Sequence, residues 1–401
     1  MTTYIIIGNG VAGNAAAESI RRHDREGVIH IFTREHVPFY YVPALPDYVA
    51  GEKEADKIII HKASWYDEHK IELHLGTVVT AVDPQQKIVT TAEGDQFRYD
   101  KLLLATGSYS FVPPIRGADL PGVMTLRTMA DAEAIKDRAR DAKQVVLIGG
   151  GLLGLEAGNG LRKIGLKVTV VEFFPRLLPR QMDVPGAAML QRRLEEMGFT
   201  FYLGAKTREI AKEGDRLQVL LEGGPSLPAD MVLISAGVRP ELALAKALGL
   251  EIDKGVKVDD HMRTGLPDIY AAGDLIEHRG RFYGIWPAAQ EQGRVAGANM
   301  AGQSAVYEGT VPSNMLKVVG IDLLSAGEID AEGRMEALVL QDEAKKIYRK
   351  VVLQDNVIVG AILLGDIRGG KEIQAAIKAK KDVSLLKDQL ARPDFDFSKL
   401  S

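Results

Sequence analysis

Two stretches of the chain repeat the same order of hydrophobic and polar positions. Each opens with a short apolar run, 4–7 or 144–148, whose β-branched residues predict a buried strand. A glycine-rich turn and a helix-forming segment follow, and a second apolar run comes after them, at 28–32 or 167–171. Because strands that alternate with helices are typical of parallel sheets, we expect two α/β domains of similar plan.

The turns between strand and helix both have the spacing GxGxxG. In this spacing the first glycine permits a tight turn, the second lets a pyrophosphate approach the backbone, and the third packs the helix on the strand. Each copy therefore predicts a dinucleotide site, and a duplication kept for stability with one empty site is the alternative. The glycines are Gly8, Gly10 and Gly13 in the first copy and Gly149, Gly151 and Gly154 in the second.

An acidic residue follows the second strand of each copy, Glu35 in the first and Glu172 in the second. Glu172 lies 18 residues after Gly154, where a carboxylate accepts hydrogen bonds from both ribose hydroxyls of an adenosine. This carboxylate would repel the 2′-phosphate of NADPH. We therefore expect the second site to prefer NADH.

A further strand that ends in glycine completes each copy, at 100–107 and 230–237, and a third one stands alone at 268–273. The third has no GxGxxG before it, so we expect the chain to leave the first domain, build the second as an insertion, and return. The expected domains are 1–112 with 241–312, then 113–240, and finally 313–401.

After residue 302 the apolar runs alternate with turn signals, which predicts an antiparallel sheet followed by helices at 372–381 and 383–390. The predicted fold is thus α/β. It has two Rossmann-like dinucleotide-binding domains, the second inserted in the first, and a small C-terminal α+β domain.

The composition of the chain excludes several kinds of functional site. The 401 residues carry a formal net charge of −4, which gives no general reason to expect nucleic acid or an anionic membrane as a partner. There is no cysteine, so thiolate nucleophiles, disulfides and protein-ligated iron–sulfur clusters are excluded. The eight histidines show no metal-ligand spacing, and we assign no metal. Without a signal sequence or a long apolar span, a cytoplasmic location is expected.

These motifs together resemble the pyridine nucleotide–disulfide oxidoreductase superfamily, flavoproteins that bind FAD and NAD(P)H. The likeness covers nearly the whole chain. The matching motifs are GNGVAG at 8–13, LLLATGS at 102–108, LRTMADA at 126–132, GGGLLGLE at 149–156, SAGVRP at 235–240 and TGLPDIYAAGD at 264–274.

The resemblance implies that the first, interrupted domain holds FAD. It implies that Glu35 is the acid that binds the ribose, with Thr33 and Arg34 as alternatives. It also implies that Arg127 lies near the phosphates, and the alternative for Arg127 is a solvated or helix-capping role. The remaining residues implied at FAD are Gly8, Gly10, Ala12, Gly13, Val79, Ala105, Thr106, Gly107, Gly273 and Asp274.

For the inserted domain the resemblance implies NADH, bound by Gly149, Gly151, Gly154, Glu172 and Gly237, with Glu156 near the nicotinamide. The segment 283–302 resembles the loop and helix that face the flavin. Trp286 is then nearest the ring, and a packing anchor is the alternative for it.

The aromatic and proline-rich segment 39–52 stands where cysteine-dependent relatives carry the cysteine that sits against the flavin. Pro43 occupies that position here, so the segment is expected to form an apolar wall of the flavin pocket, and Pro43 is counted among the cofactor-binding residues. Related ferredoxin reductases have a lysine where this chain has Asp47, which weakens a role for Glu156 in tuning the flavin. No side chain is expected to be a catalytic nucleophile, acid or base.

The expected function is an NADH-dependent flavoprotein that resembles NADH:rubredoxin oxidoreductases and the flavin module of NADH nitrite reductases. Its expected partner is a small acidic electron-transfer protein, rubredoxin or ferredoxin-like, which Lys378, Lys380 and Lys381 would attract unless they are only a solvated helix face. The alternatives are a thiol-free NADH oxidase or diaphorase and an NADH-sensing flavoprotein with little turnover. The chain is expected to be a monomer or a homodimer.

Overall fold

The computed structural model describes residues 1–311 and 313–400, and of 313–318 it describes the backbone. The chain forms two compact units. The first contains Met1–Ala44, Lys53–Ser110 and Val238–Thr310, and the second contains Leu45–Glu52, Phe111–Gly237 and Val311–Ser401. The predicted domain boundary at residue 312 lies outside the described residues.

The first unit is built on a five-stranded parallel sheet in the order β19-β7-β1-β2-β3. Its central strand has the burial of a parallel strand covered on both faces, since Ile5 and Ile6 are both fully buried. The strands are β1 (Thr3–Ile7), β2 (Val28–Phe32), β3 (Ile71–His74), β7 (Lys101–Leu104) and β19 (Ile269–Ala271).

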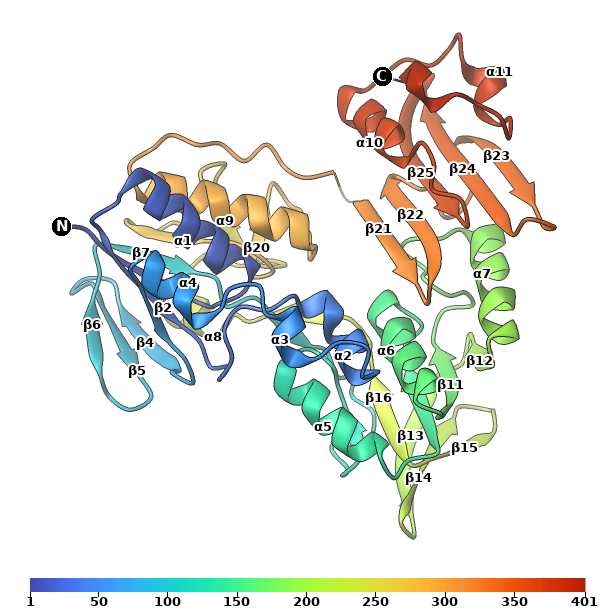
Figure 1. Cartoon of the computed structure of the whole chain (residues 1–401), viewed down its shortest axis with the longest axis horizontal. Helices are drawn as coiled ribbons and strands as arrows, with labels where there is room; N and C mark the ends of the chain where they lie inside the picture. Colours follow the sequence, from blue (N-terminus) through green and yellow to red (C-terminus); the bar gives the residue numbers. More distant parts are fainter. Residues whose placement is uncertain (312, 401) are drawn as a thin grey trace. The chain divides into compact units, whose positions relative to one another are not determined.

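Helices α1 (Val11–His23) and α9 (Trp286–Met300) lie side by side in this unit (Figure 1). Two glycines allow the close approach. A Cβ on Gly293 would stand 2.1 Å from the Ala12 carbonyl oxygen, and one on Gly297 would stand 2.3 Å from that of Ala16. Only a residue without a side chain fits at either position.

The rest of the first unit consists of short elements around this sheet. The strands β4, β5 and β6 form a separate antiparallel sheet. The bounds are η1 (Val42–Ala44), α3 (Ala55–Ile58), α4 (Ala63–Glu68), β4 (Val79–Asp83), β5 (Ile88–Thr91), β6 (Gln96–Arg98), β8 (Ser108–Ser110), β17 (Val238–Pro240), α8 (Ala243–Ala247), β18 (Val256–Val258) and β20 (Ile276–His278).

The second unit contains its own five-stranded parallel sheet, in the order β12-β11-β10-β16-β9. A three-stranded antiparallel sheet, β13-β14-β15, accompanies it. The bounds are α2 (Leu45–Val49), β9 (Val123–Met124), α5 (Met129–Ala139), β10 (Gln144–Ile148), α6 (Leu152–Lys163), β11 (Lys167–Glu172), α7 (Val184–Glu196), β12 (Phe199–Leu203), β13 (Thr207–Glu213), β14 (Arg216–Leu221), β15 (Ser226–Ala229) and β16 (Met231–Ile234).

The C-terminal part of this unit is an antiparallel sheet in the order β21-β22-β25-β24-β23, as predicted. The second helix of the tail is shorter than predicted, because the chain turns at 384–386 before α11 begins. The bounds are β21 (Ser313–Val318), β22 (Ile321–Gly327), β23 (Glu336–Asp342), β24 (Ile347–Gln354), β25 (Val357–Leu364), α10 (Gly370–Ala379), α11 (Lys387–Leu390) and η2 (Phe397–Leu400).

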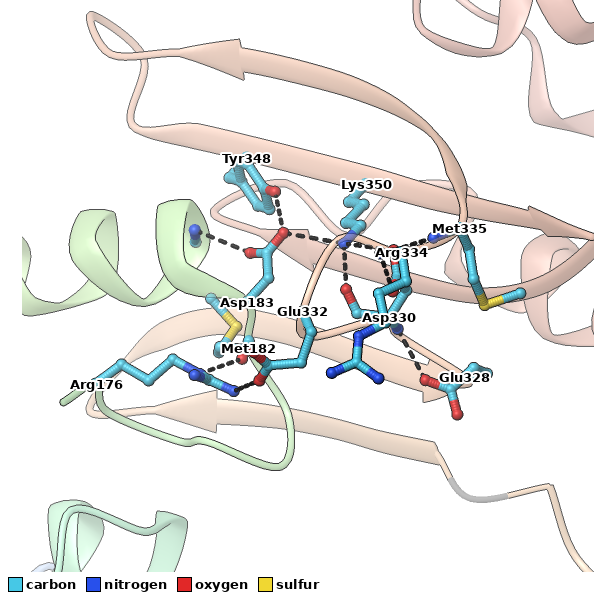
Figure 2. Close-up of polar contacts among 11 residues, drawn as sticks. Arg176, Met182, Asp183, Glu328, Asp330, Glu332, Arg334, Met335, Tyr348 and Lys350 are labelled. Atoms are coloured by element: carbon cyan, nitrogen blue, oxygen red, sulfur yellow. Dashed lines mark hydrogen bonds and ion pairs between the residues drawn. The ribbon is translucent and has the colours of Figure 1, made fainter. Parts of the chain in front are cut away.

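A buried ionic cluster connects α7 with this C-terminal sheet (Figure 2). The ammonium of Lys350 lies 3.3 Å from Asp183 Oδ2 and 3.7 Å from Asp330 Oδ2, and all three side chains are at most 7% exposed. The Tyr348 hydroxyl donates to Asp183 Oδ2 at 2.5 Å, and Asp183 Oδ1 accepts from the Gly186 N–H and so caps α7. Asp330 accepts from the backbone N–H of Arg334 on Oδ1 and from that of Met335 on Oδ2, so each carboxylate has partners on both of its oxygens.

The fold class is confirmed: two parallel sheets of Rossmann type and a C-terminal antiparallel sheet. Within the described residues, every helix is too short or too polar to cross a bilayer.

Candidate nucleotide-binding sites

The first glycine turn is closed on its protein side and open where a pyrophosphate would approach. A Cβ on Gly8, whose φ is +123°, would stand 2.0 Å from the Ala105 carbonyl oxygen, and one on Gly13 would stand 2.0 Å from that of Gly8. Around Gly10 no described atom lies within 4 Å of such a Cβ. The turn therefore has the shape that a dinucleotide requires.

Helix α1 begins immediately after this turn, and among the described side chains none caps it. Its first backbone N–H groups, with the positive end of the helix dipole, are thus suited to a phosphate. Gly273, with φ +86°, lies against the start of α1, since its Cβ would come within 3.0 Å of the Ala12 side chain. The structure thus brings the predicted residues Gly10, Ala12, Gly13 and Gly273 together.

A buried polar network that the glycine pattern did not predict supports the turn. The Asn14 amide donates to the carbonyl oxygens of Asn9 and Gly10 and to the Asn9 side chain at 2.9–3.0 Å. The Tyr66 hydroxyl lies 3.0 Å from the Oδ1 atoms of both asparagines. Burial raises the pKa of Tyr66 to about 12, so the hydroxyl stays a donor. The polar Asn9 inside GNG was the available sequence signal.

Glu35 lies after β2, and its Oε2 accepts a hydrogen bond from the Tyr40 hydroxyl at 2.7 Å. Of its predicted alternatives, Thr33 is buried and accepts from the Glu35 N–H, whereas Arg34 is exposed and lies 3.6 Å from Glu241. Tyr40 thus holds the carboxylate in place, and a contact between Glu35 and the ribose stays a prediction. Val79 is buried at the start of β4.

Hydrogen bonds also hold the segment that follows β7 and the acid that follows β19. Gly107 has φ +68°, and the Thr106 hydroxyl donates to the Glu241 carbonyl oxygen at 3.0 Å. The Ser108 hydroxyl donates to Asp274 Oδ2 at 2.8 Å. Asp274 is therefore oriented by a residue that sequence reasoning did not single out. Buried Gln292, also not predicted, accepts the N–H of Gly273 at 3.0 Å.

The aromatic segment contributes to a cluster in the first unit. The ring of Phe39 stacks on Trp286 with centroids 5.6 Å apart, and Tyr41 meets Trp286 edge-on at 5.1 Å. Trp286 thus packs in a cluster, which agrees with its packing-anchor alternative, and a flavin contact stays a prediction. Pro43 is exposed in η1, and its place in an apolar wall also stays a prediction.

The second glycine turn repeats the geometry of the first. A Cβ on Gly149, whose φ is +117°, would stand 2.2 Å from the Ser235 carbonyl oxygen, and one on Gly154 would stand 2.8 Å from that of Gly149. No described atom lies within 4 Å of the position at Gly151, and no described side chain caps α6. Gly237 has φ +91° at the end of the returning strand.

Glu172 is only 6% exposed, and both of its oxygens have backbone partners. Oε2 accepts from the Gly150 N–H at 2.5 Å, and Oε1 accepts from the Phe174 N–H at 2.8 Å. Because each carboxylate oxygen has two lone pairs, one on each remains for a ribose hydroxyl. Glu172 therefore both shapes the glycine turn and presents a negative charge beside it.

Glu156 lies on α6 and accepts a hydrogen bond from the Val319 N–H at 2.9 Å. Burial raises the pKa of Glu156, and the nearby charge of Asp47 raises it further. Asp47, which stands where related ferredoxin reductases have a lysine, is thus an acid close to Glu156, and a role for Glu156 near the nicotinamide stays a prediction.

Arg127 stands before the N-cap of α5, and its backbone N–H donates to Asp131 at 2.8 Å. A contact between Arg127 and the FAD phosphates stays a prediction.

The family models agree with this geometry. Residues 2–293 match the pyridine nucleotide-disulphide oxidoreductase family, and residues 312–381 match the rubredoxin NAD+ reductase C-terminal domain. The chain is 28% identical to the solved structure of a ferredoxin reductase from Rhodopseudomonas palustris, with a TM-score of 0.91, over 100% of this chain and 99% of that one.

Two curated proteins of different lengths are similar to the chain. The chain is 31% identical to the NADH-rubredoxin oxidoreductase of Clostridium acetobutylicum over 95% of both proteins. It is 36% identical to the assimilatory nitrate reductase electron transfer subunit of Bacillus subtilis over 97% of this chain and 51% of that protein. It thus spans about half the length of this protein and of the nitrite reductase [NAD(P)H] of Bacillus subtilis. The chain belongs to the pyridine nucleotide-disulphide oxidoreductase family, and its cofactors are FAD and NADH.

Proposed function

We propose that this chain passes electrons from NADH through FAD to a small electron-carrier protein such as rubredoxin, without a redox-active cysteine. The observation that carries the proposal is the absence of cysteine from all 401 residues, with Pro43 at the position of the cysteine in thiol-dependent relatives. Electrons cannot pass to a thiol of this chain, so they must leave for an external acceptor. The match of residues 312–381 to the rubredoxin NAD+ reductase C-terminal domain supports a protein acceptor.

The chain's own groups would bind and orient the cofactors, which supply hydride transfer from NADH and electron release in single steps from the flavin. Gly10 and the start of α1 would hold the FAD pyrophosphate, and Asp274, oriented by Ser108, would accept a hydrogen bond from the ribityl chain. Gly151 and the start of α6 would hold the pyrophosphate of NADH, and Glu172 its ribose.

An acidic carrier would be attracted by the end of α10. Lys378 and Lys380 are exposed there, while Lys381 is partly covered and donates to the Lys399 carbonyl oxygen at 3.2 Å. Replacing Lys378 and Lys380 by glutamate should slow rubredoxin reduction and flatten its dependence on salt. An unchanged rate and salt dependence would show that these lysines are only a solvated helix face.

Acceptor preference tests the proposal. We would measure steady-state oxidation of NADH by the FAD-loaded protein with rubredoxin, ferredoxin, a quinone or oxygen as the sole acceptor. The expected result is a kcat/KM for rubredoxin at least about tenfold above that for the quinone or oxygen. Rapid peroxide formation in air with slow rubredoxin reduction would indicate an oxidase. A persistent long-wavelength band without turnover would indicate a sensor. Either result contradicts the proposal.

A further inference from the structure

Three potential metal ligands meet on one face of the first unit's sheet. The edge strand β3 pairs in parallel with β2, with His30 opposite Glu72 and Phe32 opposite His74. Since residues two apart on a strand point to the same face, His30, Glu72 and His74 project together. They were not predicted as a site, because the ligands come from two strands about forty residues apart and lack the local spacing of a metal motif.

Two of the donor-atom separations are close to those that a tetrahedral metal ion imposes. His30 Nδ1 is 3.1 Å from His74 Nε2 and 3.2 Å from Glu72 Oε2, and all three atoms lie within 4.8 Å of one another. Zinc bonds to histidine nitrogen and carboxylate oxygen are about 2.0–2.2 Å long, which places neighbouring tetrahedral ligand atoms roughly 3.3–3.6 Å apart. An ion therefore fits between these atoms with small side-chain shifts.

Hydrogen bonds cannot account for both short contacts of His30 Nδ1. His30 Nδ1 approaches both His74 Nε2 and Glu72 Oε2, but in a neutral imidazole this nitrogen has at most one proton. Whichever tautomers are present, only one of the two short contacts is then a full hydrogen bond. A cation placed among the three atoms interacts favourably with all of them.

The surroundings hold the imidazoles in position and keep the site accessible. The His74 ring stacks on Phe32 with centroids 4.4 Å apart and planes 7° from parallel, and Phe97 meets it edge-on at 5.3 Å. The His30 side chain is 13% exposed, whereas that of Glu72 is 63% exposed. The imidazoles are thus oriented by packing, and the carboxylate can close over an ion that enters from solvent.

We propose that His30, Glu72 and His74 bind one divalent transition-metal ion such as zinc, with water as its fourth ligand. Two imidazoles and one carboxylate, without a thiolate, suit zinc, nickel or copper better than magnesium or calcium. The ion would fasten the edge strand β3 to β2. The proposal does not depend on which molecule accepts the electrons.

The test uses the full-length, untagged, FAD-loaded protein freed of metal, with zinc chloride as the probe. Isothermal titration and metal analysis after dialysis should find about one zinc per chain. His30→Ala and His74→Ala should weaken the affinity at least about 100-fold. His23→Ala removes an exposed histidine at the end of α1 and should leave zinc binding unchanged. Zinc should raise the melting temperature of the wild type and of His23→Ala but not that of His30→Ala or His74→Ala.

Glu72→Gln provides a second variant, since its exposed side chain is not part of the core. It should keep its FAD and its metal-free melting temperature, while its affinity for zinc falls about tenfold or more. A wild-type protein that takes up no zinc would overturn the proposal. Undiminished binding in His74→Ala and in Glu72→Gln would overturn it as well.

Discussion

Glu172 gives the sharpest prediction at the scale of a single residue. Glu172→Gln keeps the size of the side chain but removes its charge and half of its acceptor capacity. The hydrogen bonds to the NADH ribose should weaken, and the repulsion of the NADPH 2′-phosphate should disappear. We expect the ratio of kcat/KM for NADH to that for NADPH to fall by about 10- to 100-fold, corresponding to roughly 1.4–2.8 kcal/mol. Asp141→Asn, at an exposed position of the same unit, is the control and should leave the ratio unchanged.

Glu156 predicts a dependence of stability on pH. Burial, and then the charge of Asp47, raises the pKa of Glu156 above its value in the unfolded chain. Between these two values the folded protein binds more protons than the unfolded one, so stability falls as pH rises through this window and stays lower above it.

Glu156→Gln removes this penalty and keeps an oxygen that can accept from the Val319 N–H. Its melting temperature should exceed that of the wild type by about 1–4 °C near pH 8 and equal it near pH 4. The control is Glu133→Gln, which alters an exposed position on α5. A melting temperature of Glu156→Gln below that of the wild type near pH 8 would show that the carboxylate stabilises the fold.

At the scale of elements, the contact between α1 and α9 connects packing with cofactor binding. Gly293→Ala places a Cβ 2.1 Å from the Ala12 carbonyl oxygen, in the first turn of the helix that would hold the FAD pyrophosphate. We expect a loss of about 1–3 kcal/mol in stability and faster release of FAD, followed by flavin fluorescence. Gly265→Ala is the control, because no described atom lies within 4 Å of its Cβ position. Equal FAD retention in both variants would contradict the role of this contact.

The elements that could be predicted were those with strong local patterns. The strands Val28–Phe32 and Gln144–Ile148 have the predicted bounds, because each is rich in β-branched and other apolar residues and is followed by a polar residue or a glycine. The structure of segment 39–52 was harder to predict. The segment is divided between the two units, and its residues Leu45–Val49 form α2, which includes Pro46. Its contacts are with residues distant in sequence, so its own pattern could not reveal them.

In the candidate sites, too, some residues were predictable from a local pattern and others were not. The glycines and acids were predictable because turn geometry and charge require those residue types at fixed spacing. Tyr40, Ser108 and Gln292 were not, because each acts through a hydrogen bond to a predicted residue, and such partners have no pattern of their own.

At the scale of the whole molecule, the C-terminal sheet and α7 belong to the same compact unit, and the buried ionic cluster lies between them. Lys350→Met should remove the cation between Asp183 and Asp330 and leave two buried carboxylates uncompensated (Figure 2). The expected loss is about 3–5 kcal/mol, seen as a lower urea midpoint by circular dichroism. Lys345→Met, at an exposed lysine of the same unit, should shift the midpoint little. Equal midpoints for the two variants would show that the cluster is neutral to stability.

Electron transfer from NADH through the flavin to rubredoxin is best tested by a single-turnover experiment without oxygen. The FAD-loaded protein is reduced with NADH and mixed with oxidised rubredoxin in a stopped-flow instrument, while flavin and rubredoxin absorbance are followed. About one NADH per chain should bleach the flavin, because there is no thiol pair to reduce, and about two rubredoxins should then be reduced as the flavin reoxidises. A flavin that NADH does not bleach, or that stays reduced in the presence of rubredoxin, would rule out this route of electron transfer.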